Sequence, residues 1–277
     1  MTPRRLDFAD HRRDLGENQY IYAVVSRRAG GLSIGVNLNP DKVCNFDCPY
    51  CQVDRTTPGG SARIDLVRLE SELRHLLTLV ASGQLWDTAP FDTAAAEHRA
   101  VVDIAFAGDG EPTSPPEFPA AAALVRALRD ELAPTVPLRL LTNATLVHRS
   151  AVRAALASFD DLWCKLDAGT DAWFHRVDGT RFPFNRVLRN LRELAAERPI
   201  VIQAMFCSLG EDRPGAEEIA AWVGRLRHIG RHGTISEVQV YTVARKPASS
   251  SVGALSAQEL DSIATTARAA GLNARVS

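Results

Sequence analysis

The chain has 277 residues, of which 45% are hydrophobic and 23% are charged, an ordinary globular composition with enough length for one large domain or two small ones. Its 32 Lys and Arg residues balance 33 Asp and Glu residues, and the net charge of −1 excludes a global field that would concentrate nucleic acid or anionic membranes, although it does not exclude a local basic patch. The N-terminal segment has no apolar core of the secretory type, and no apolar run approaches the roughly 18 residues of a membrane span. We therefore expect a soluble, cytoplasmic protein with no membrane partner.

Short apolar runs alternate along the chain with longer amphipathic stretches. The runs are rich in Val, Ile, Leu and Phe, as buried parallel strands are, and they cover 32–38, 101–108, 138–143, 161–167, 200–206 and 237–243. Helical periodicity predicts helices over 63–83, 117–133, 148–158, 184–197, 214–229 and 256–271. The six strand–helix units fall short of the eight in a closed barrel, so the pattern predicts an α/β fold of the partial (β/α)₆ TIM-barrel type.

Three segments follow from this pattern. Residues 1–31 form an N-terminal extension, with a β-hairpin expected to turn near Gly30 and Gly31. Residues 32–245 form the barrel. Residues 246–277 form a polar linker and a C-terminal helix that packs on the barrel. Residues 171–187 mix aromatic side chains with arginines, which favours a lid or a solvated loop over a substrate-binding loop.

The loop after the first barrel strand carries Cys44, Cys48 and Cys51 in the spacing C-x₃-C-x₂-C. An odd total of five cysteines argues against a disulfide framework in a cytoplasmic protein. Three thiolates on one short loop are able to hold three irons of a [4Fe–4S] cluster, which leaves the fourth iron open for a ligand. Cys164 and Cys207 instead lie in or next to apolar strands, where packing is the favoured role.

Two other interpretations of the cysteine loop stay open on the residues alone. A structural zinc site would need a fourth ligand and normally two C-x₂-C knuckles or a C-x₂-C with a histidine pair. An iron–sulfur centre that only transfers electrons or senses redox state would be expected to have four local cysteines.

The sequence CNFDCPYC resembles the cysteine signature of the radical S-adenosylmethionine (SAM) superfamily. The resemblance implies a [4Fe–4S] cluster and SAM as cofactors, reductive cleavage of SAM to a 5′-deoxyadenosyl radical, and hydrogen abstraction from a substrate. It also implies an electron donor, either a reductase or a flavodoxin or ferredoxin. It places Tyr50, the aromatic residue before the last cysteine, beside the adenine of SAM. On the residues alone, Tyr50 fits equally well as a loop residue that covers the cluster.

A glycine-rich turn, AGDGEPT, ends the second strand, and such turns allow a ligand to approach the backbone. It resembles the GGEP motif of the family, which binds the SAM amino group. The resemblance assigns Gly110, Glu111 and Pro112 to SAM binding. Asp109 stands where the motif has its first glycine, so nothing is assigned to Asp109.

Polar residues at the ends of the later strands extend the predicted site, because ligands of parallel α/β folds bind at the carboxyl ends of strands. Thr142 and Asn143 are expected either to contact a ribose or carboxylate or to cap the next helix. Lys165 and Asp167 share one face of their strand, and we expect them to bind the SAM carboxylate and a ribose hydroxyl or the substrate. Gln203 is a further polar residue in an apolar strand that needs a partner, and we include it among the candidate cofactor-binding residues. Arg245 is expected to bind an anionic substrate group, and we group it with Lys165 and Asp167 as candidate catalytic residues.

The branch of the superfamily stays open. The motif loops resemble those of wyosine-type tRNA-modifying enzymes, although the known members carry additional N-terminal cysteines and none precedes Cys44 here. Length and cysteine spacing resemble the activating enzymes of glycyl radical proteins. The substrate is therefore a small molecule, a tRNA or a protein, and the reaction is expected to be of the oxidoreductase or lyase type.

Overall fold

The computed structural model describes residues 15–26, 30–244 and 249–277, and it separates into two compact units. The first unit contains Met1–Val43, Pro58–Leu140 and Ser150–Asp160. The second contains Cys44–Thr57, Leu141–Arg149 and Asp161–Ser277. Within the described ranges, every helix is too short or too polar to pass through a lipid bilayer.

The first unit is a four-stranded sheet with helices. Its elements are β1 (Ile21–Ser26), β2 (Gly31–Val36), α1 (Leu66–Ser82), β3 (Val101–Phe106), α2 (Phe118–Leu132), β4 (Leu138–Thr142, in this unit up to Leu140) and α3 (Ser150–Ala155), with 3₁₀ turns at Gln84–Asp87, Phe91–Thr93, Ala96–His98 and Leu156–Ser158. The order is β1-β2-β3-β4, with β1–β2 antiparallel and the other pairs parallel. Ile21 lies opposite Val36 in the β1–β2 ladder, which confirms the predicted N-terminal hairpin.

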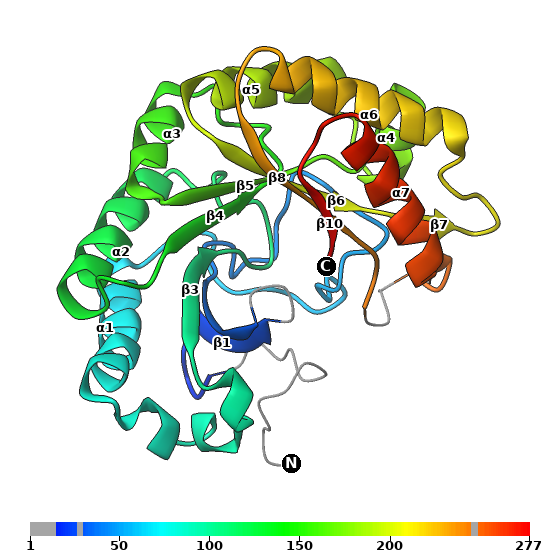
Figure 1. Ribbon diagram of the computed structural model, residues 1–277. Coiled ribbons are helices and arrows are strands. Elements are labelled where there is room, and N and C mark those ends of the chain that lie inside the picture. The colour runs from blue at the N-terminus through cyan, green and yellow to red at the C-terminus, as the bar shows by residue number, and fades with distance from the viewer. Residues whose placement is uncertain (1–14, 27–29, 245–248) are drawn as a thin grey trace. The chain divides into compact units, whose positions relative to one another are not determined.

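Helices α1 and α2 lie side by side (Figure 1). Helix α1 begins where the Asp65 side chain accepts hydrogen bonds from the first-turn backbone amides, and it ends at Gly83, whose φ of 74° is the left-handed conformation that favours glycine. Its leucines at three- and four-residue spacing are buried, namely Leu69, Leu73, Leu76 and Leu77. The amphipathic pattern therefore forms the helix that was predicted over 63–83.

The second unit is a parallel sheet with a small antiparallel ladder. Its elements are β5 (Asp161–Lys165), α4 (Asp171–Val177), α5 (Phe184–Glu197), β6 (Ile200–Met205), β7 (Cys207–Leu209), α6 (Ala216–Gly230), β8 (Ile235–Tyr241), β9 (Val252–Ala254), α7 (Ala257–Ala269) and β10 (Ala274–Val276). The parallel order is β5-β6-β8-β10, and β7 pairs with β9. Helices α5 and α6 run next to each other (Figure 1).

Two expectations differ from the structure. The lid or solvated loop expected over 171–187 is not a solvated loop, because α4 and the start of α5 occupy most of it and Trp173, Phe174 and Val177 are buried as core residues. The tail expected to be a linker and a helix also contains the short strands β9 and β10. The division at residues 31 and 245 stays a prediction.

Candidate metal and cofactor site

The cysteine loop lies in the second unit, and its three cysteines are half-buried thiols that form no disulfide. The backbone turns between the last two cysteines, since the Cys51 N–H donates to the Cys48 carbonyl at 2.8 Å. Among the described residues, no three His, Cys, Asp or Glu side chains are grouped closely enough to hold a metal ion as they stand. Each sulfur instead contacts a different polar neighbour.

Two of the sulfurs accept hydrogen bonds from cations. Lys165 Nζ lies 2.9 Å from Cys48 Sγ, and Arg55 Nη1 lies 3.2 Å from Cys51 Sγ. Cys44 Sγ lies 3.9 Å from the side-chain oxygen of Asn45. Positive charges at two sulfurs would offset the negative charge that cysteine ligands carry as thiolates.

Lys165 is the centre of a buried ionic cluster at the end of β5. Its Nζ lies 2.5 Å from Asp178 Oδ1 and 3.4 Å from Asp167 Oδ2. The same ammonium lies over the rings of Tyr50 and Phe46, with 4.8 Å and 5.2 Å to the ring centroids. Both carboxylates are almost fully buried. The predicted pairing of Lys165 and Asp167 on one face is therefore confirmed, and Asp178 is an additional partner.

The charges in this cluster perturb one another. Burial raises the pKa of the Cys48 thiol to about 12, although Lys165 acts to lower it. Burial opposes the charge on Lys165, but Asp178, Cys48 and Asp167 outweigh it and hold its pKa well above the ordinary value. Burial also raises the pKa of Asp178 to about 7, with Lys165 opposing the rise. Such perturbed groups concentrate at functional sites.

Asp167 anchors the cysteine loop to the sheet. Its Oδ2 accepts a short hydrogen bond from the Tyr50 hydroxyl, and its Oδ1 accepts one from the Met205 N–H at 2.9 Å. Burial and the negative charge of Asp167 raise the pKa of Tyr50 well above the ordinary value. Tyr50 therefore stays protonated and donates to Asp167.

The turn after α4 packs against the cysteine loop. Gly179 has a φ of 56°, and its carbonyl accepts from the Asp47 N–H at 3.3 Å. A Cβ at Gly179 would lie 1.9 Å from the Asp47 carbonyl oxygen, so only glycine fits. Thr180 Oγ1 donates to the Asn45 carbonyl at 3.3 Å. These contacts place Asp178, which precedes Gly179, beside Cys48.

The strand-end residues Thr142 and Asn143 organise their own turn. Asn143 Oδ1 accepts from the Thr145 N–H at 3.1 Å, and its Nδ2 donates to Asn45 Oδ1 at 2.7 Å. Thr142 Oγ1 accepts from the Ala144 N–H at 3.0 Å. The helix-cap alternative for Asn143 is wrong, because α3 begins only at Ser150. Asn143 instead connects the β4 turn to the cysteine loop.

The remaining residues predicted in the second unit have separate surroundings. Gln203 Nε2 donates to Gln239 Oε1 at 3.0 Å, which supplies the partner that a buried amide needs. Arg245 lies outside the described residues. Cys164 and Cys207 are fully buried, as expected for packing residues, and burial raises the pKa of Cys207 to about 12.

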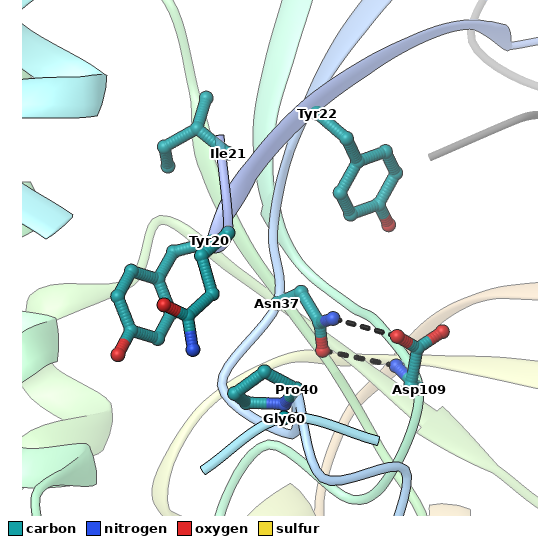
Figure 2. Close-up of a pocket in the computed structure, with 8 residues that line it drawn as sticks. Tyr20, Ile21, Tyr22, Asn37, Pro40, Gly60 and Asp109 are labelled. Atoms are coloured by element: carbon teal, nitrogen blue, oxygen red, sulfur yellow. Dashed lines mark hydrogen bonds between the residues drawn. The ribbon is translucent and has the colours of Figure 1, made fainter. Parts of the chain in front are cut away.

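The glycine-rich turn lies in the first unit, where two asparagines support it. Asn37 Nδ2 donates to Asp109 Oδ2 at 2.8 Å, and its Oδ1 accepts from the Asp109 N–H at 3.0 Å (Figure 2). A Cβ at Gly110 would lie 2.2 Å from the Val43 carbonyl oxygen and 2.7 Å from Asn39 Cγ. Gly110 is therefore required where the turn crosses this segment. The Glu111 carboxylate is buried and accepts from Thr113 Oγ1 at 2.6 Å, and Pro112 is buried beside it.

Asn37 and Asp109 also line an open cavity of about 400 Å³ in the first unit. Figure 2 shows Tyr22 and Asp109 on the same side of Asn37. The full lining is Gln19, Tyr20, Ile21, Tyr22, Asn37, Pro40, Gly60 and Asp109. Asp109, the residue that departs from the GGEP pattern, therefore serves to brace the turn through Asn37.

One buried acceptor beside Gly110 is unsatisfied. Asn39 Nδ2 donates to Ser114 Oγ at 3.1 Å, and Ser114 Oγ in turn donates to the Glu111 carbonyl at 2.7 Å. These two hydrogen bonds fix which side-chain atom of Asn39 is the nitrogen and therefore where its oxygen lies. Its Oδ1 is buried, and no residue within the described ranges donates a hydrogen bond to it. A buried acceptor of this kind costs free energy unless a ligand supplies a donor.

Both sets of residues fit the groups that they are expected to hold. Three thiols on one loop with Lys165 and Arg55 at two sulfurs suit an anionic iron–sulfur cluster, and a rotation about one side-chain torsion would reorient each thiol. The unsatisfied Asn39 oxygen beside Gly110 suits an amino group. Sequence reasoning missed Asp178, Asn39 and Arg55. Only Arg55, four positions after Cys51, had a local signal.

A family model described as the radical SAM superfamily matches residues 38–223. The chain is 30% identical to UPF0026 protein MJ1312 of Methanocaldococcus jannaschii over 145 residues, which are 52% of this chain and 39% of that protein. It is 26% identical to a UPF0026 protein of Helicobacter pylori strain J99 over 174 residues, 62% of this chain and 49% of that protein. The chain thus spans less than half the length of these curated relatives.

Several solved structures share the fold. SuiB of Streptococcus suis, bound to S-adenosylmethionine, has a TM-score of 0.60 and 15% identity, over 91% of this chain and 52% of that one. A radical SAM methyltransferase from Sphaerobacter thermophilus has a TM-score of 0.62 and 16% identity, over 93% of this chain and 68% of that one. TYW1 with a lysine–pyruvate adduct bound has a TM-score of 0.58 and 12% identity, over 92% of this chain and 85% of that one. These likenesses confirm the predicted α/β class, a mostly parallel sheet like that of the partial TIM barrels.

Proposed function

Because the chain belongs to the radical SAM superfamily, we propose that it cleaves S-adenosylmethionine reductively and uses the resulting radical to take a hydrogen atom from a substrate. Family membership implies a [4Fe–4S] cluster and SAM as cofactors. The cluster, when bound, supplies one electron that splits SAM into methionine and a 5′-deoxyadenosyl radical. Every other role falls to the residues of this chain.

The observation that carries the proposal is the set of three cysteine thiols on one loop, none of them in a disulfide, with cations at two of the sulfurs. Cys44, Cys48 and Cys51 would each ligate one iron, so one iron keeps a site for SAM. Lys165 and Arg55 would compensate the thiolate charge through their hydrogen bonds to Cys48 and Cys51. A purely structural zinc site would need a fourth protein ligand, because structural zinc sites are closed and four-coordinate.

The binding roles follow from the same residues. We assign the SAM amino group to Gly110, Glu111 and Pro112, with Asn39 as an additional acceptor. Tyr50 is assigned to the adenine, Thr142, Asn143 and Gln203 to the remaining polar groups of SAM, and Lys165 and Asp167 to its carboxylate and ribose. Arg245 is assigned to an anionic group of the substrate.

The reaction outcome, the substrate class and the electron donor are more specific proposals than SAM cleavage itself. We favour an oxidoreductase or lyase outcome, with a methyl transfer as the alternative that a fold neighbour illustrates. One neighbour was solved with a precursor peptide bound, so a peptide or protein substrate stands beside a tRNA or a small molecule. We expect a reductase, or a flavodoxin or ferredoxin, to deliver the electron in the cytoplasm.

The test is anaerobic reconstitution with iron and sulfide, followed by SAM and dithionite. We expect a brown protein that releases 5′-deoxyadenosine. A brown protein that releases none when reduced would support electron transfer alone. A colourless protein that retains zinc would contradict the proposal.

Asn39 offers a separate test of the amino-group assignment. We expect Asn39→Ala to weaken SAM binding about fivefold, roughly 1 kcal/mol, because an acceptor is lost from the ligand site. The free energy of unfolding should fall by no more than about 1 kcal/mol, because the variant loses the hydrogen bond from Asn39 Nδ2 to Ser114 Oγ, whereas the deleted oxygen has no donor among the described residues. Equilibrium dialysis of the oxidised reconstituted protein measures the first quantity, and urea unfolding of the unreconstituted protein measures the second. If Asn39→Ala and the unsubstituted protein bind SAM with equal affinity, Asn39 is not part of the SAM site.

A further inference from the structure

We propose that Lys165 and Asp178 form a buried ion pair that sets the reduction potential of the cluster. Lys165 raises the potential through its N–H···S hydrogen bond to Cys48, and Asp178 is a positioning residue that holds the ammonium against that sulfur. The inference rests on the proposed function, since it requires the cluster to assemble on the three cysteines.

The geometry of the ion pair supports this role. Lys165 Nζ lies 2.5 Å from Asp178 Oδ1 and 2.9 Å from Cys48 Sγ, so one ammonium bridges the carboxylate and the ligand sulfur. Asp178 Oδ1 itself lies 3.9 Å from Cys48 Sγ. The ammonium therefore lies nearer to the sulfur than the carboxylate does.

Surrounding contacts keep the pair in place. Gly179 and Thr180 tie the Asp178 turn to the backbone of the cysteine loop. The rings of Tyr50 and Phe46 lie next to the Lys165 ammonium. Asp178 is almost fully buried and only about a fifth of the Lys165 side chain is exposed, so water screens their charges weakly.

The electrostatic consequence has a definite sign. Reduction adds one electron from an external one-electron donor to the cluster, and no bond forms or breaks in that step. A cation hydrogen-bonded to a ligand sulfur stabilises the added negative charge and raises the potential, whereas a nearby carboxylate lowers it. The two side chains therefore act in opposite directions, and the nearer cation dominates.

A second cation provides a matched comparison. Arg55 Nη1 lies 3.2 Å from Cys51 Sγ, close to the distance between Lys165 and Cys48. Arg55 is less deeply buried than Lys165, so its charge is closer to solvent. Solvent screening should make the effect of Arg55 on the potential smaller than that of Lys165.

The experiment is a redox titration of the reconstituted protein, followed by EPR of the reduced cluster at one mildly alkaline pH. We expect Lys165→Met to lower the potential by at least 59 mV, a tenfold loss in the one-electron reduction equilibrium. In Asp178→Asn the amide oxygen still accepts a hydrogen bond from Lys165, so the ammonium stays at Cys48. The negative charge that lowers the potential is lost, so the potential should rise. The reduction potential of the double variant should lie between those of the two single variants. Arg55→Met should shift the potential less than Lys165→Met does.

The outcomes separate this inference from the proposed function. Unchanged potentials in both single variants, or shifts of the same sign, would overturn the ion-pair role even if the wild-type protein cleaves SAM. Failure of the wild-type protein to assemble any cluster would overturn both proposals. If Lys165→Met assembles no cluster, the rise expected for Asp178→Asn still decides the question. General damage to the fold would not produce shifts of opposite sign.

Discussion

Cys48→Ala is expected to abolish the iron–sulfur cluster and, with it, all SAM cleavage. The substitution removes one of only three local thiols, and a cluster held by two of them would lose a third of its protein ligands. It also removes the sulfur that pairs with Lys165, which leaves the buried ammonium to the carboxylates of Asp167 and Asp178. Iron and sulfide content, visible absorption and 5′-deoxyadenosine release measure the result.

Cys164→Ala is the matched control for this experiment. Cys164 is fully buried in β5, in the strand that also carries Lys165. The variant should lose about 1 kcal/mol of unfolding free energy through the small cavity that it creates, and it should keep the full cluster. Cluster loss in Cys164→Ala, or cluster retention in Cys48→Ala, would contradict the ligand assignment.

Gly110→Ala is expected to lower SAM affinity at least tenfold, about 1.4 kcal/mol, without loss of the cluster. The added Cβ would lie 2.2 Å from the Val43 carbonyl oxygen and 2.7 Å from Asn39 Cγ, so either the turn or the Asn39 amide must move. Because the Asn39 amide and the Gly110–Glu111 backbone are both assigned to the SAM amino group, either movement spoils the same contacts. Equilibrium dialysis of the oxidised reconstituted protein gives the affinity.

Gly60→Ala controls for the general effect of adding a methyl group to a loop of the first unit. Its Cβ would lie 3.4 Å from the nearest atom, the side-chain amide of Gln19, and no backbone strain is involved. We expect its SAM affinity to equal that of the unsubstituted protein. A tenfold loss in both variants would show that the effect does not come from the GDGEP turn.

Much of the fold was predictable because its signals are local. Each of the six apolar runs is a strand, and α5 has the predicted bounds, because hydrophobic periodicity depends on neighbouring residues alone. The prediction was wrong over 171–187, where the aromatic residues Trp173 and Phe174 suggested a surface loop. They are buried on α4, since a short helix places such residues on one face that packs against the unit.

The sequence predicts the cysteine ligands of the candidate site, and it does not predict the residues that surround them. The spacing of Cys44, Cys48 and Cys51 is visible within one loop, and the alternation of Lys165 and Asp167 indicates a shared face. No pattern pointed to Asp178, which meets Cys48 across 130 positions of sequence. The unsatisfied oxygen of Asn39 is equally invisible in a sequence, because burial and hydrogen-bond partners belong to the folded state.

The sequence by itself determined the three-cysteine loop, its missing fourth ligand and the order of the strands that support it, because these depend on spacing along the chain. The tertiary structure decided which charges meet those cysteines. It placed Lys165 on Cys48 and Asp178 on Lys165, and it directed the Asp109 side chain to Asn37. The physical reason is that electrostatic interactions and hydrogen bonds act over a few ångströms in space, and only folding brings residues from distant parts of the chain within that range.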